Sequence, residues 1–124
     1  MDTKGTVLYI EDNPENRMLI RRVLEAEGFR VVLAANATEA FQVLQQERPQ
    51  VVLMDISMPD VDGYTLTARI KSMPGFEKLP VIALTANVMR GEQERALRAG
   101  CDGYLQKPVD IDLLAQQIES FMRR

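Results

Sequence analysis

Five residues of this 124-residue chain could handle a phosphoryl group if they met at one point. They follow four separate apolar runs, and they are Glu11, Asp12, Asp55, Thr85 and Lys107. Carboxylates are the oxygen ligands that Mg²⁺ prefers, and a carboxylate can also act as a phosphoryl-accepting nucleophile. A hydroxyl and an ammonium group can contact the phosphoryl oxygens. The pattern predicts a Mg²⁺-dependent phosphoryl-acceptor site, provided that the four runs are parallel strands of one sheet.

Short apolar runs alternate five times with longer helical patterns. The strands are predicted over Thr6–Glu11, Arg30–Ala34, Val51–Met54, Pro80–Thr85 and Asp102–Gln106. The helices are predicted over Glu15–Glu27, Ala37–Leu44, Tyr64–Lys71, Asn87–Ala99 and Ile111–Met122. This alternation predicts an α/β fold in one domain, with a parallel sheet and helices on both faces.

The ends and buried faces of the helices are predicted from caps and spacing. The first helix is expected to bury Met18, Leu19, Val23 and Ala26, and to end at Gly28.

Asn36 is expected to cap the second helix, with Glu39 completing a capping box. Asp110 is expected to cap the last helix, whose apolar stripe begins at Ile111. Helix Asn87–Ala99 has a thin apolar face, which predicts low local stability.

The acids should gather at the carboxyl ends of the strands, where ligands bind in open α/β sheets. In the flavodoxin-like order 2-1-3-4-5, the first and third strands are neighbours, which brings Glu11 and Asp12 close to Asp55. Three clustered anions should raise one another's pKa, and a divalent cation would remove the repulsion. We expect Asp12 and Asp55 to bind Mg²⁺ directly, Glu11 to bind it through water, and the Ser57 carbonyl to complete the shell.

Asp55 is the predicted nucleophile, because it ends the most apolar strand, where pairing on both sides fixes its backbone. Lys107 and Thr85 are expected to contact phosphoryl oxygens, and the small Ala86 leaves room for the incoming group. A cis peptide bond between Lys107 and Pro108 would aim the lysine. Each residue alone would be interpreted as an ordinary loop or cap residue. The prediction of a phosphoryl-acceptor site depends on their joint position at four strand ends.

Composition excludes several other chemistries. The chain has no histidine, which excludes a Ser-His-Asp triad, a Cys-His pair and a histidine-based zinc site. Its single cysteine, Cys101, allows no internal disulfide and is expected to be a buried apolar residue. The net charge is −3 without a basic cluster, so we expect no direct nucleic-acid binding. No signal peptide or membrane span is predicted, and the expected location is cytoplasmic.

These residues resemble the receiver domain of two-component response regulators over essentially the whole chain, residues 1–124. The resemblance extends to single-domain regulators of the chemotaxis-regulator-like and DivK-like kinds, and to receivers attached to hybrid histidine kinases. It implies a doubly wound (βα)5 flavodoxin-like three-layer sandwich with strand order 2-1-3-4-5 and no output domain. The matching segments are Glu11-Asp12-Asn13, Asp55-Ile56-Ser57-Met58-Pro59-Asp60-Val61-Asp62-Gly63, Leu84-Thr85-Ala86 and Lys107-Pro108.

The resemblance implies that Asp55 accepts a phosphoryl group from a phosphohistidine of a sensor histidine kinase or histidine phosphotransfer protein. Glu11 and Asp12 would then be the Mg²⁺ acids, with Mn²⁺ as a substitute ion, and Lys107 the phosphate contact. The expected product is an aspartyl phosphate that loses its phosphoryl group slowly by self-hydrolysis.

The resemblance also implies a switch. Thr85 would be the switch hydroxyl and Tyr104 the switch aromatic, although Tyr104 on generic grounds is a simple packing residue. Ser57 and Asn87 occupy positions that tune the lifetime of the phosphate. The face formed by helix 4, strand 5 and helix 5 would change and bind a downstream protein effector.

Four hypotheses follow. The first is a stand-alone phosphorylation switch, as a monomer or a phosphorylation-dependent dimer, and the second is a phosphorelay intermediate. The third is a receiver cut from a hybrid histidine kinase. The fourth, an aspartate-nucleophile phosphatase of the haloacid dehalogenase type, fits less well, because such enzymes resemble Asp-x-Asp where this chain has Glu11-Asp12-Asn13.

Overall fold

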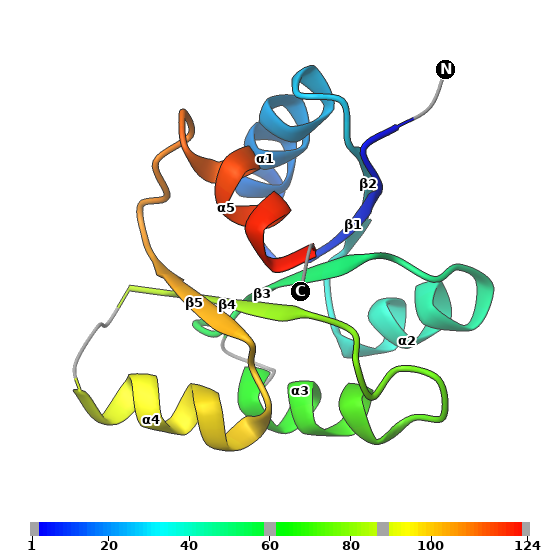
Figure 1. The fold of residues 1–124 in the computed structure, drawn as a ribbon, viewed down its shortest axis with the longest axis vertical. Helices are drawn as coiled ribbons and strands as arrows, with labels where there is room; N and C mark the ends of the chain where they lie inside the picture. The colour runs from blue at the N-terminus through cyan, green and yellow to red at the C-terminus, as the bar shows by residue number, and fades with distance from the viewer. Residues whose placement is uncertain (1–2, 59–61, 87–89, 123–124) are drawn as a thin grey trace.

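A five-stranded parallel sheet forms the centre of the protein in a computed structural model that describes residues 3–58, 62–86 and 90–122 (Figure 1). The strand order is β2-β1-β3-β4-β5, which confirms the predicted flavodoxin-like order. The strands are β1 (Thr6–Ile10), β2 (Arg30–Ala34), β3 (Val51–Asp55), β4 (Val81–Thr85) and β5 (Gly103–Gln106). The helices are α1 (Pro14–Ala26), α2 (Ala37–Gln46), α3 (Gly63–Ser72), α4 (Arg90–Ala99) and α5 (Leu114–Met122).

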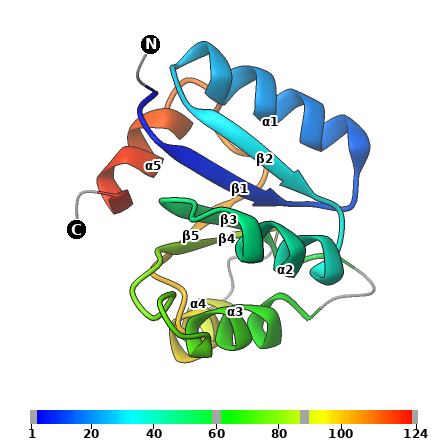
Figure 2. The same ribbon diagram turned by 90° about the vertical axis from the view of Figure 1, so that its right-hand side faces the viewer.

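Helices cover both faces of the sheet, giving three layers. Helices α1 and α5 lie on one face, and α2, α3 and α4 lie on the other (Figures 1 and 2). Successive residues of the central strands point to opposite layers, so that Leu53 packs toward α1 and α5, while Val52 and Met54 pack toward α2 and α3. All residues of β3 and β4 are buried, as expected for strands covered on both faces.

The predicted strand ends are correct to within one residue, and most helix ends follow the expected caps. The Asn36 side chain accepts the Glu39 N–H at 2.9 Å, and the Glu39 carboxylate accepts the Ala35 N–H at 2.8 Å. Gly28 and Gly100 follow α1 and α4 with φ of +99° and +102°, a region where only glycine avoids a Cβ penalty.

The predicted buried stripe of α1 is wrong except for Val23, which is half-buried and packs against core residues. Met18 is 45% exposed, Leu19 is 50% exposed and Ala26 is also exposed, whereas Ile20 and Leu24 are buried against the sheet. The helix carries two overlapping apolar stripes, and a helix can press only one of them against a sheet. Since Ile20 and Leu24 are four residues apart, they form the stripe that packs, and Met18 and Leu19 remain at the surface.

The predicted cap of α5 is also wrong. The Asp110 carboxylate accepts the Asp112 N–H at 2.9 Å and its carbonyl accepts the Leu113 N–H at 3.0 Å, so Asp110 closes a separate turn over residues 111–113. Helix α5 begins after that turn, at Leu114. Ile111, which was expected on the buried stripe, is therefore 46% exposed.

Helix α4 makes little apolar contact with the rest of the protein. Among its described side chains only Ala96 is buried, which confirms the thin apolar face. Its predicted start at Asn87 lies outside the described residues. Cys101, just after α4, is buried as expected. No helix within the described ranges is long and apolar enough to cross a membrane.

The orientation of α1 can be tested with a matched pair of substitutions. Leu24→Ala should lower the free energy of unfolding by about 2–4 kcal/mol, because it opens a cavity in a fully buried position. Met18→Ala should change it by less than about 0.5 kcal/mol, because that side chain is largely exposed. Urea unfolding followed by circular dichroism measures both, and equal losses would contradict the orientation of the helix.

Candidate functional site at the carboxyl edge of the sheet

All five predicted residues lie along the carboxyl edge of the sheet, just at or beyond the strand ends. Strand pairing aligns Ile10 with Met54, and Thr85 with Gln106. Backbone hydrogen bonds continue past the strands: the Glu11 N–H donates to the Ala34 carbonyl at 2.9 Å, and the Lys107 N–H to the Thr85 carbonyl at 2.8 Å. Hydrogen bonds between the strands thus fix the backbone positions of the residues whose side chains form the site.

Three carboxylates converge at this edge. Glu11, Asp12 and Asp55 each offer an oxygen atom, and these atoms lie within 4.8 Å of one another. Glu11 and Asp55 are 1% and 3% exposed, whereas Asp12 is open to water. The all-oxygen donor set, with one side open to water, fits Mg²⁺, which prefers a few carboxylates and keeps part of its hydration shell.

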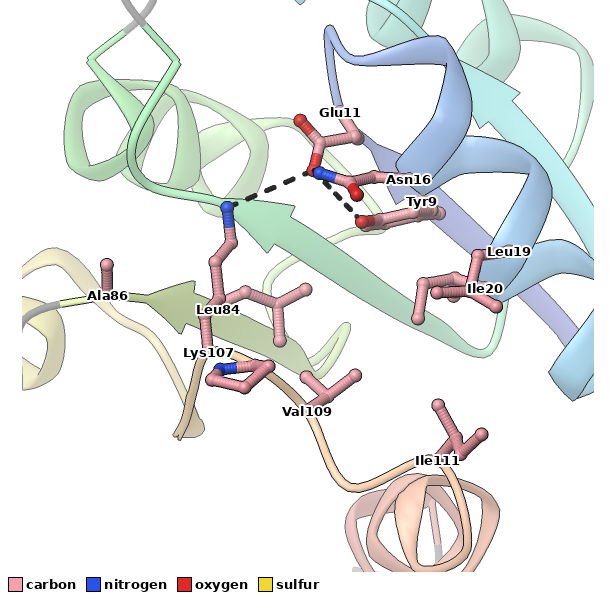
Figure 3. Close-up of a pocket in the computed structure, with 11 residues that line it drawn as sticks. Tyr9, Glu11, Asn16, Leu19, Ile20, Leu84, Ala86, Lys107, Val109 and Ile111 are labelled. Carbon is pink, nitrogen blue, oxygen red and sulfur yellow. Dashed lines mark hydrogen bonds and ion pairs between the residues drawn. The ribbon is translucent and has the colours of Figure 1, made fainter.

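Lys107 reaches into this cluster from the end of β5. Its Nζ lies 2.7 Å from Asp55 Oδ1. The same atom lies 3.9 Å from Glu11 Oε1 (Figure 3). The Ser57 N–H donates to the same Asp55 oxygen at 2.9 Å. The Lys107–Pro108 bond is cis, as predicted. Asp55 is thus held by one cation and one backbone donor.

Three further residues support the acids and were missed by the sequence analysis. The Tyr9 hydroxyl and the Asn16 amide donate to Glu11 Oε1 at 3.1 and 3.2 Å. The Arg17 guanidinium donates to the backbone carbonyls of Glu11 and Asp12 at 2.8 and 2.9 Å, which holds the β1–α1 loop. One signal was available: Tyr9 stands two residues before Glu11 in an otherwise aliphatic strand, so both side chains share one face.

The two buried acids have pKa values shifted in opposite directions. Burial, together with the neighbouring Asp55 carboxylate, raises the pKa of Glu11 to about 7. Burial also acts to raise the pKa of Asp55, but contacts with Glu11, Lys107 and the Ser57 N–H outweigh it and lower that pKa. The expectation that every acid in the cluster would have a raised pKa is therefore wrong for Asp55, because its contacts with Glu11, Lys107 and the Ser57 N–H favour the ionised carboxylate.

Thr85 and Tyr104 lie toward the helix α4 side of the sheet. Thr85 is buried at the end of β4, and it lines a cavity of about 270 Å³ together with Ser57 and Ala86. Tyr104 is half-buried on β5 and packs against the cluster that contains residues of α3 and α4. Asn87 lies outside the described residues.

An apolar groove adjoins the site on the opposite side. It has a volume of about 410 Å³, with Leu19 and Ile20 from α1 on one wall and Val109 and Ile111 on the other (Figure 3). Glu11 and Lys107 also line it.

The groove has an exposed apolar border, which we call the apolar rim. It consists of Leu19 and Ile111, which line the groove and are 50% and 46% exposed. Both are among the five large apolar side chains that are exposed within the described residues, and their sequence neighbours Met18 and Leu113 are two more. The rim was not predicted from the sequence, because apolar residues with the spacing of a buried helix stripe are expected to belong to the core.

The chain is similar to known proteins along nearly its full length. The family model of the response regulator receiver domain matches residues 7–119. The polar-differentiation response regulator DivK of Brucella anthropi is 35% identical over 117 residues, which cover 94% of this chain and 95% of the relative. The response regulator Rre1 of Synechocystis sp. is 40% identical over 96% of this chain, which spans 52% of that relative.

Solved structures agree. The receiver domain of a sensor histidine kinase from Pseudomonas aeruginosa PAO1, with a magnesium ion coordinated in its active site cleft, is 34% identical. It superposes with a TM-score of 0.87 over 97% of this chain and 98% of that one.

The raised pKa of Glu11 predicts a stability change that depends on pH. Between the ordinary pKa of 4.5 and about 7, the folded protein binds more protons than the unfolded chain, so this acid makes stability fall as pH rises. Without divalent cations, Glu11→Gln should raise the free energy of unfolding by about 1–2 kcal/mol at pH 8 and by progressively less toward pH 5. Urea unfolding in EDTA at both pH values measures this, and a gain that is equal at both would contradict the assigned charge.

Proposed function

Because this chain belongs to the response regulator receiver domains, the phosphorylation switches of two-component systems, we propose that Asp55 is its phosphoryl acceptor. The observation that carries the proposal is the contact of 2.7 Å between Lys107 Nζ and Asp55 Oδ1, beside two further carboxylates. A buried carboxylate that faces a cation and two metal-binding acids has the groups that phosphoryl transfer requires.

Asp55 is suited to act as the nucleophile. Its lowered pKa keeps the carboxylate ionised at neutral pH, and strand pairing on both sides fixes its backbone. The attacking carboxylate oxygen forms a bond to phosphorus while the bond between phosphorus and the donor histidine nitrogen breaks. The nitrogen keeps the electron pair, and the product is an aspartyl phosphate. Since these 124 residues include no histidine, the phosphohistidine would lie outside them.

Glu11, Asp12 and Asp55 would hold a Mg²⁺ ion, or Mn²⁺ with the same oxygen ligands. When bound, the ion supplies positive charge that offsets the negative charge of the transferring group. The Ser57 backbone carbonyl remains a predicted ligand.

The remaining residues complete the proposed switch. Lys107, which contacts Asp55 before transfer, would contact a phosphoryl oxygen afterwards. Thr85 would donate its hydroxyl to another oxygen, Ala86 would leave room for the group, and Tyr104 would follow Thr85 inward. Ser57 and Asn87 would set how fast water reaches the aspartyl phosphate. The surface of α4, β5 and α5 would then change for a downstream protein effector.

The apolar rim is the proposed docking surface for the phosphodonor, a sensor histidine kinase or a histidine phosphotransfer protein. A donor must bring its phosphohistidine to Asp55, and the groove beside the rim is lined at its inner end by Glu11 and Lys107. Exposed apolar side chains next to a reactive site favour association with another protein. The same site would serve a terminal switch, a relay intermediate, or a receiver attached to a histidine kinase like the Pseudomonas aeruginosa domain.

A small phosphodonor tests the acceptor assignment. Incubation with acetyl phosphate and Mg²⁺ should add one phosphoryl group to the wild-type protein, detected by intact mass spectrometry, because Asp55 can attack any reactive phosphoryl donor. Asp55→Asn should abolish the gain while its circular dichroism spectrum stays unchanged. Labelling of the variant at the wild-type rate would refute Asp55 as the acceptor.

A protein phosphodonor tests the docking surface. The double variant Leu19→Ala with Ile111→Ala should accept phosphate about tenfold more slowly from a histidine phosphotransfer protein that labels the wild type, because truncating apolar anchors weakens association. Its labelling by acetyl phosphate should remain normal. Leu97→Ala, at an exposed site on α4, is the matched control, and equal rates for all three proteins would eliminate the rim as the docking surface.

A further inference from the structure

Helix α4 lies beside α3 (Figures 1 and 2), and only Ala96 and Ala99 of its described side chains pack against the core. The buried Ala96 supplies little apolar area, so contacts made by other side chains carry more weight in fixing the helix. The described ion pairs Arg95–Glu92 and Arg98–Glu94 each join two residues of α4, so neither pair by itself holds the helix to α3.

A latch of three side chains joins the two helices. The Tyr64 hydroxyl, from the first turn of α3, donates to Glu92 Oε2 at 2.7 Å and lies 3.3 Å from the Glu92 carbonyl oxygen. The Arg95 guanidinium lies 4.8 Å from the centre of the Tyr64 ring and 3.2 Å from Glu92 Oε1. Tyr64 is 9% exposed, so its hydrogen bond to a carboxylate is partly shielded from water.

The α3 end of the latch is packed against the residue that follows Asp55. A Cβ at Gly63 would lie only 2.6 Å from Ile56 Cδ1 and 3.2 Å from Ile56 Cα, so the start of α3 touches Ile56 directly. The Ile56 N–H in turn donates to the Leu84 carbonyl at 3.0 Å, which ties this segment to β4. The start of α3, which carries Tyr64, is therefore held against the segment that follows Asp55.

The α4 end of the latch faces the same space as the acceptor site. The cavity of about 270 Å³ is lined by Ser57, Thr85 and Ala86, and also by the three latch residues Tyr64, Glu92 and Arg95. A phosphoryl group on Asp55 would add nearly two negative charges close to this cavity. That charge would repel the Glu92 carboxylate and attract the Arg95 guanidinium, and both effects oppose the contacts of the latch.

We propose that Tyr64, Glu92 and Arg95 form a latch that holds α4 against α3 in the unphosphorylated protein, and that phosphoryl charge on Asp55 releases it. The release step rests on the proposed function. The holding step does not, because it concerns only the unphosphorylated protein. By linkage, a latch that phosphorylation opens must itself oppose phosphorylation.

The holding step is tested by hydrogen–deuterium exchange of the α4 amides in the unphosphorylated protein. Tyr64→Phe keeps the ring and removes the hydroxyl, and it should speed exchange in α4 by about three- to tenfold, the equivalent of one net hydrogen bond. Glu94→Gln removes an exposed charge whose Arg98 partner lies 4.0 Å away on the same helix, and should leave exchange unchanged. Equal exchange in wild type and Tyr64→Phe would overturn the latch.

The release step is tested with beryllofluoride, a phosphoryl mimic that binds to an aspartate carboxylate, in the presence of Mg²⁺. Tyr64→Phe should bind it about three- to tenfold more tightly than wild type, because no latch has to open. Glu92→Gln keeps an oxygen acceptor for Tyr64 but loses the charge, so beryllofluoride should speed α4 exchange less than in wild type.

Unchanged affinity in Tyr64→Phe would refute the release step alone. Absence of binding to any variant, with the exchange result intact, would refute the proposed function and with it the release step, but leave the holding step.

Discussion

Two carboxylates, Glu11 and Asp55, are buried side by side at the carboxyl edge of the sheet, and much of the surrounding structure offsets the cost of that placement. An unpaired buried charge costs several kcal/mol, which is comparable to the entire free energy of unfolding of a small domain. Lys107 compensates Asp55 directly, while Tyr9 and Asn16 compensate Glu11. The acids and these partners come together from the ends of β1, β3 and β5 and from helix α1, so the arrangement requires the parallel sheet to form.

The same placement explains the chemistry proposed for the site. The two neighbouring acids have pKa values shifted in opposite directions, and Lys107 lies 2.7 Å from Asp55 and 3.9 Å from Glu11. The closer acid stays ionised and can act as a nucleophile, whereas the farther acid has a pKa near neutrality. A divalent cation at the three carboxylates would neutralise the negative charge that Lys107 alone does not balance.

The positions of the acids could be predicted from the sequence because they depend on local signals. Unbroken apolar runs identify buried parallel strands, and the residue after each run must lie at the sheet edge. The face of α1 could not be predicted, since Met18 and Leu19 are as apolar as Ile20 and Leu24, and only the position of the sheet decides which pair is buried. The Tyr64–Glu92 contact, between residues 28 positions apart, depends on the placement of two helices and has no local signature.

Ala86 borders both the apolar groove on the α1 side and the polar cavity on the α4 side. The Ala86 methyl group thus lines both the groove proposed to receive the phosphodonor and the cavity proposed to respond to phosphorylation. No long chain of displaced residues would have to connect the two sides. In a receiver built this way, one small residue would contact both the surface that receives the phosphoryl group and the cavity that responds to it.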